Sequence, residues 1–122
     1  MVTIELTEHN IAEQVRRAGV TLVDFRADWC APCRSFEPVF EAASQAHPDV
    51  TFGTVDTEVE RVLVASAHIT SIPTLMAFRD GILVHRQAGA LRADELDDVI
   101  AMVRDLDMVD IRARHERMKE SA

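Results

Sequence analysis

Residues 23–33 read Val23-Asp24-Phe25-Arg26-Ala27-Asp28-Trp29-Cys30-Ala31-Pro32-Cys33 and contain both cysteines of the chain. Residues 20–25, which are β-branched and mostly apolar, predict a strand covered on both faces, and residues 33–46 predict a helix. A Cys-x-x-Cys that opens a helix places its two cysteines on one face, about 4.5 Å apart along the axis. Disulfides need Cα separations of about 4.4–6.8 Å, so this pair can form one with little backbone movement.

The start of a helix also favours thiolate chemistry. The first four N–H groups have no partner within the helix and carry the positive end of its dipole, which stabilises a thiolate on Cys30. Pro32 suits the first turn because it has no N–H and its φ is already helical. We therefore expect Cys30, at an exposed lip, to be the nucleophile and Cys33, one turn further in, to be the resolving thiol.

Two other interpretations of the cysteine pair are weaker. A structural zinc site usually has four ligands, and neither His47 nor His68 has a partner at ligand spacing, so we expect no metal. Two core cysteines that happen to lie close together are the other alternative. A redox couple explains the pair better than either of these.

Strands and helices are expected to alternate along the rest of the chain. Because this order consists of a βαβ half followed by a ββα half, it predicts an α/β fold with a mixed sheet covered by helices on both faces. Cys30 then lies just beyond the carboxyl end of a central strand, where sites of such folds tend to lie. The expected strands are residues 2–6, 20–25, 50–55, 74–78 and 82–85, and the expected helices are residues 7–18, 33–46, 59–68 and 93–103.

Composition excludes several classes of protein. The 122 residues carry a net charge of −8, which argues against a nucleic-acid or anionic-membrane partner. No apolar run approaches the roughly 20 residues of a membrane span, and the first ten residues lack the features of a signal peptide. We expect a cytoplasmic monomer.

The motifs together resemble those of the thioredoxin family. Besides residues 23–33, the segments Thr70-Ser71-Ile72-Pro73-Thr74, Asp80-Gly81 and Gly89-Ala90 match the family in the same order, over roughly residues 2–105. The resemblance implies a thioredoxin-like domain at residues 1–105 and a polar extension at residues 106–122. It also implies a general protein disulfide reductant with no cofactor beyond its redox-active disulfide. Its partners would be disulfide-containing proteins and a flavin- and NADPH-dependent thioredoxin reductase that re-reduces it.

The same resemblance suggests roles for residues around the cysteines. Asp24 becomes a proton acceptor for Cys33, although the residues alone make a structural or solvent-facing Asp equally plausible. Pro73 is expected to follow a cis bond and to pack against the disulfide, whereas a trans Pro at an edge strand is the alternative. The implied substrate-binding surface consists of Trp29, Ala31, Pro32, Ile72, Gly89 and Ala90.

Some residues depart from the family pattern. Ala31 replaces a usual Gly, and Arg26 replaces a frequent aromatic residue. Thr54 lies where many members have a Lys facing the buried Asp, so the charge balance around Asp24 is open. Arg34 either favours the thiolate electrostatically or is a solvated surface residue.

Residues 106–122 extend beyond the resemblance. Their apolar spacing allows an amphipathic helix that docks on the domain or on a partner, but we favour a solvated, fraying tail. The residues of this segment that carry the helical spacing are Met108, Ile111, His115 and Met118.

For the domain itself, the competing functions are a net oxidant or isomerase and a pure binding module.

Overall fold

A single mixed sheet of five strands, in the order β1-β3-β2-β4-β5, forms the centre of the molecule. In the computed structural model, which describes residues 2–121, β1 and β2 run parallel to β3. β4 runs antiparallel to both β2 and β5. The strands are β1 (Thr3–Glu5), β2 (Val20–Arg26), β3 (Thr51–Asp56), β4 (Thr74–Arg79) and β5 (Ile82–Ala88).

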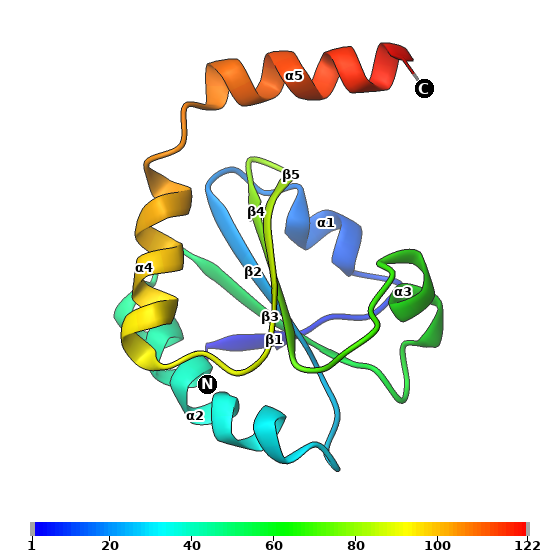
Figure 1. Cartoon of the computed structure of the whole chain (residues 1–122), viewed down its shortest axis with the longest axis vertical. Coiled ribbons are helices and arrows are strands. Elements are labelled where there is room, and N and C mark those ends of the chain that lie inside the picture. The colour runs from blue at the N-terminus through cyan, green and yellow to red at the C-terminus, as the bar shows by residue number, and fades with distance from the viewer. Residues whose placement is uncertain (1, 122) are drawn as a thin grey trace.

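Helices cover both faces of this sheet (Figure 1). α2 and α4 lie on one side, and the two short helices α1 and α3 lie on the other. This confirms the predicted α/β fold with a βαβ half and a ββα half. The helices are α1 (Ile11–Val15), α2 (Ala31–Ala46), α3 (Arg61–Ser66), α4 (Ala93–Arg104) and α5 (Met108–Ser121).

Successive side chains of β2 enter two separate apolar cores, which explains why this strand is mostly apolar and buried along almost its whole length. Leu22 packs in the core beneath α2 and α4, whereas Val23 and Phe25 pack in the core on the other face. Since side chains alternate along a strand, Asp24 lies on the same face as Leu22, toward α2. The core under α2 includes Phe36, Phe40 and Phe52, with ring centroids 5.6 and 5.1 Å apart in successive pairs.

The first helix is shorter than expected. The prediction of a helix over residues 7–18 capped by Thr7 is wrong, because the helix covers only Ile11–Val15 and its N-cap is Asn10. The Thr7 N–H instead donates to Asn10 Oδ1 at 2.7 Å, which closes a turn ahead of the helix. Local side-chain hydrogen bonds of this kind compete with helix formation.

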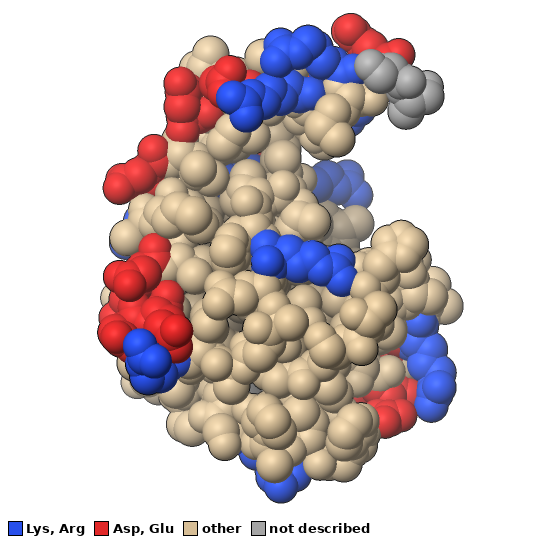
Figure 2. Space-filling view, viewed as in Figure 1, with Lys and Arg blue, Asp and Glu red and all other residues tan. Residues whose placement is uncertain are grey.

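The C-terminal extension is a helix rather than the fraying tail that we favoured. α5 meets the body at its first turn, where Met108 is buried, and Arg112 Nη1 donates to Asp80 Oδ2 at 3.3 Å. Beyond this turn the helix projects, and Figure 2 shows open space between its outer half and the rest of the molecule. The expectation that this segment is mostly solvated is nevertheless correct, because most of its side chains are exposed.

Candidate functional site

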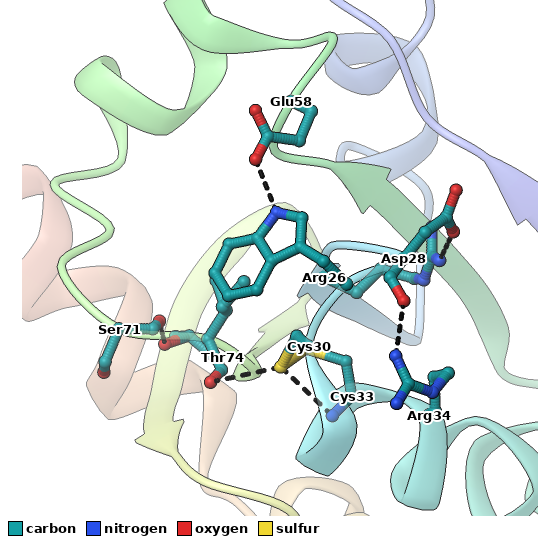
Figure 3. Close-up of a disulfide and its surroundings, with 10 residues drawn as sticks. Arg26, Asp28, Cys30, Cys33, Arg34, Glu58, Ser71 and Thr74 are labelled. Carbon is teal, nitrogen blue, oxygen red and sulfur yellow. Dashed lines mark hydrogen bonds and ion pairs between the residues drawn. A yellow bond between two sulfur atoms is a disulfide. The ribbon is translucent and has the colours of Figure 1, made fainter.

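A disulfide between Cys30 and Cys33 marks the candidate site, where the loop after β2 enters α2 (Figure 3). The two Cα atoms are 5.2 Å apart, within the range that a disulfide needs. Cys30 is the N-cap of the helix, and Ala31 and Pro32 fill its first two positions. The pair therefore closes without interrupting α2.

One backbone N–H group donates to the sulfur of Cys30. The Cys33 N–H donates to Cys30 Sγ at 3.2 Å, as the side chain of an N-cap residue does. In the reduced protein the same donor, together with the helix dipole, faces any thiolate that forms on Cys30. The geometry thus favours negative charge on the outer of the two sulfurs.

Cys30 is less accessible than the sequence suggested. Cys30 is only 5% exposed and Cys33 1%, so the expectation of an exposed lip is wrong for the Cys30 side chain. The two pack with Ala27 and the half-buried Ile72 in a small apolar cluster. The order of exposure, with Cys30 the outer sulfur, is as expected.

The segment before β4 lies directly against this cluster. The Ile72–Pro73 peptide bond is cis, and the carbonyl oxygen of Ile72 lies 3.7 Å from Cys30 Sγ. The Pro73 carbonyl accepts a hydrogen bond from the Gly89 N–H at 2.8 Å, and Thr74 Oγ1 donates to the Ser71 carbonyl at 2.6 Å. Residues 71–74 are therefore held in place beside the disulfide.

Exposed residues surround the sulfurs at the surface. Trp29 is 66% exposed, and its indole Nε1–H donates to Glu58 Oε1 at 2.5 Å. Residues 31, 32, 89 and 90 are also exposed. The residues named for substrate binding thus include one large exposed aromatic and several small or rigid residues. Glu58 was not foreseen, since nothing local connects residues 29 positions apart.

Asp24 lies in β2, on the face of the sheet toward α2, and is buried, with 1% of its surface exposed. Burial raises its pKa from 3.8 to about 7; Arg26 opposes this change and Glu37 adds to it. Oδ1 of Asp24 has no hydrogen-bond partner among the described residues. The residue beside it in the register of β2 and β3 is Thr54, which cannot supply a positive charge.

A cavity of about 480 Å³ connects Asp24 with charged residues between α2 and the sheet. Its lining includes Arg26 from β2 and Arg34, Glu37 and Glu41 from α2. Arg34 Nη1 donates to the Asp28 carbonyl at 2.8 Å, which anchors it at the surface. Glu37 was not singled out from the sequence, although its position one helical turn after Cys33 placed it on that side of α2.

No three His, Cys, Asp or Glu side chains within residues 2–121 are grouped so that they could hold a metal ion. Over the same residues, no helix is both long and apolar enough to span a bilayer.

Comparison with known proteins agrees with this geometry. A family profile described as Thioredoxin matches residues 2–102. A protein named putative thioredoxin 2 from Streptomyces coelicolor is 46% identical over 110 residues, which are 90% of this chain and 82% of that protein. A thioredoxin from Chlamydia trachomatis is 35% identical over 96 residues, or 79% of this chain and 93% of that protein.

Solved structures agree as well. A single-residue variant of thioredoxin from Halobacterium salinarum superposes with a TM-score of 0.79 at 28% identity, covering 85% of this chain and 92% of that one. Oxidised mitochondrial thioredoxin 3 from Saccharomyces cerevisiae superposes with a TM-score of 0.74 at 27% identity, covering 81% of this chain and 93% of that one. With its disulfide in a Trp-Cys-x-x-Cys at the start of α2, this chain belongs to the thioredoxin family of protein-disulfide oxidoreductases.

Proposed function

We propose that this protein is a general reductant of protein disulfides, acting through the Cys30–Cys33 dithiol, and that a thioredoxin reductase returns it to the reduced form. The observation that carries the proposal is the position of Cys30 as the N-cap of α2, with its sulfur accepting the Cys33 N–H. A thiolate there is stabilised and remains the outer sulfur of the pair.

The reaction takes place in two exchanges. The Cys30 thiolate attacks one sulfur of a substrate disulfide, which forms a mixed disulfide and releases the other substrate sulfur as a thiolate. Cys33 then loses its proton to Asp24, and its thiolate attacks Cys30 Sγ. The Cys30–Cys33 disulfide forms and the second substrate sulfur leaves, so two electrons pass to the substrate. The protein itself carries these electrons in its cysteine pair, without a bound cofactor.

Substrate binding is assigned to the surface around Cys30. The exposed Trp29 offers apolar area, and we assign the backbone of Ile72, which lies beside Cys30 Sγ, to pairing with an extended segment of the substrate. Ala31, Pro32, Gly89 and Ala90 are small or rigid and leave the approach to the sulfur open. We place this activity in the cytoplasm and the protein as a monomer.

Two cysteine variants and a measurement of the reduction potential test this proposal. Cys30→Ser should abolish turnover of a protein disulfide substrate, whereas Cys33→Ser should accumulate a mixed disulfide that mass spectrometry detects. A binding module would show no turnover even with both cysteines intact. Equilibration against a defined dithiol buffer should give a reduction potential below that of the glutathione pool. A higher potential would place the protein among disulfide-forming enzymes instead.

A further inference from the structure

The cavity between α2 and the sheet contains an unusual set of charges for a buried carboxyl group. Asp24 is almost fully buried, yet no hydrogen-bond donor meets its Oδ1 among the described residues. β1 and β3 contribute only the uncharged Thr3 and Thr54 to the cavity lining. On the other side of β2, the register partner of Asp24 in β4 is Leu75. All charges that face Asp24 therefore come from β2 itself and from α2.

These charges are of opposite sign and differ in how they are held. Arg26 belongs to β2, and its guanidinium donates to the Asp28 carboxylate, which neutralises part of its charge (Figure 3). Arg34 donates a hydrogen bond to the Asp28 carbonyl oxygen. Glu37 and Glu41 lie one turn apart on α2, and Glu41 Oε2 accepts a hydrogen bond from Thr3 Oγ1 at 3.2 Å. No ion pair within 4.0 Å engages Glu37 among residues 2–121, although its charge interacts with that of Arg26 at longer range, so the two residues act on the cavity together.

A lysine cannot take part in this arrangement. The chain has a single Lys, residue 119, and it lies in the outer part of α5. Two arginines and two glutamates thus line the cavity beside Asp24: Arg26 is shared with Asp28, and Glu37 is the exposed carboxylate on the α2 wall.

We propose that Glu37 and Arg26 are positioning residues for the resolving step, which act in opposite directions on the proton of Asp24 through this cavity. The inference rests on the proposed role of Asp24 as the proton acceptor for Cys33. Glu37 disfavours a second negative charge in the cavity and so helps Asp24 to keep a proton. Arg26 favours the carboxylate. The electrostatic contributions to the pKa of Asp24 have these same signs.

The consequence lies in when Asp24 can accept a proton. Transfer of the Cys33 proton to Asp24 converts a carboxylate and a thiol into a carboxylic acid and a thiolate, so it requires Asp24 to be ionised beforehand. A higher proton affinity makes Asp24 a stronger base but leaves less of it ionised at a given pH. Glu37 and Arg26 therefore set the pH range over which Cys33 is released for attack.

The direct test follows the Asp24 carboxyl carbon by NMR while the pH of the oxidised full-length protein is changed. Glu37→Gln should lower the titration midpoint of Asp24 by roughly 0.5 pH unit, the size expected for one charge across a solvent-accessible cavity. Glu37→Lys should lower it further, and Arg26→Gln should raise it. The combined E37Q and R26Q variant should return close to the original midpoint.

Controls separate charge at this site from net charge and from folding. Glu13→Gln removes one negative charge from α1, on the opposite face of the sheet, and should leave the midpoint unchanged. Glu37 is exposed, so both of its variants should fold, and they keep the test valid even if the Arg26 variant does not. Unchanged midpoints in both Glu37 variants would overturn the inference, as would equal shifts in Glu13→Gln.

A second readout distinguishes this inference from the proposed function. The pH dependence of release from the Cys30 mixed disulfide should move in the same direction as the Asp24 midpoint in each variant. If the midpoint moves but the release profile does not, Asp24 is not the acceptor for Cys33. That result would overturn both the proposed role of Asp24 and the part of this inference that links Glu37 to catalysis. If Asp24→Asn loses turnover while the Asp24 midpoint is unmoved in the Glu37 and Arg26 variants, only the assignment of Glu37 and Arg26 is overturned.

Discussion

Replacing Asp24 by Asn should stabilise the protein, and the gain should depend on pH. Asn preserves the size of the side chain but removes a charge that the protein must otherwise bury at neutral pH. The pKa of Asp24 is raised from 3.8 to about 7 by burial, a change of about three pH units. At about 1.4 kcal/mol per unit, the buried carboxylate costs on the order of 4 kcal/mol at high pH.

The sign of the pH dependence follows from proton binding. Between pH 4 and 7 the folded protein keeps a proton on Asp24 that the unfolded chain has already lost, so stability falls as the pH rises. Below pH 4 both states are protonated and the cost disappears. Above about pH 7 both are ionised and the cost is constant. The variant has no such group, so its advantage should grow from pH 4 to 7 and then level off.

Urea unfolding of the oxidised protein and of Asp24→Asn, at several pH values from 4 to 8.5, gives this difference directly. Subtracting the two free energies of unfolding removes the contributions of groups common to both proteins. Asp98→Asn, which changes an exposed carboxylate on α4, serves as the charge-matched control and should show no comparable trend. A difference that stays constant across this range would refute the conclusion that Asp24 titrates in a buried site.

Three further changes test packing and the role of α5. Gly53→Ala would bring a Cβ into collision with the buried Leu6 side chain and should lower the free energy of unfolding by about 1–3 kcal/mol in urea titration. Arg79→Ala removes the guanidinium that donates to the last carbonyls of α4 at 2.8 and 2.9 Å, and should cost about 1–3 kcal/mol. Truncation after Leu106 removes buried Met108 and should lower the melting temperature slightly; a loss of disulfide-reducing activity would show that α5 also contributes to function.

Elements with a strong local signal were predictable from the sequence. The β-branched and mostly apolar residues 20–25 predicted a covered strand, and the observed β2 extends it by one residue. Asp80-Gly81 predicted a hairpin, and both residues have positive φ there, 53° and 85°. The position of the cysteine pair at the start of a helix likewise followed from spacing and from Pro32 alone.

Features that depend on distant residues were not predictable in this way. The first helix was misjudged because the Thr7 N–H donates to Asn10 Oδ1 in a turn, and the helix begins only after Asn10. The hydrogen bond between Trp29 and Glu58 joins two loops that only the sheet brings together. The charges around Asp24 could be counted in the sequence, but which of them face the same cavity depends on how α2 packs on β2 and β3.

The position of β2 in the middle of the sheet also determines which parts of the molecule can open. β2 is hydrogen-bonded to β3 along one side and to β4 along the other, whereas β1 and β5 lie at the edges. Amide protons of residues 21–25 should exchange with solvent only when the whole domain unfolds, and those of the edge strands through local fluctuations. The cysteines follow this strand after a short loop and stand at the start of α2, next to the part of the chain that should exchange most slowly. We therefore expect the partner that brings its disulfide to Cys30 to supply most of the conformational adjustment in each cycle of oxidation and reduction.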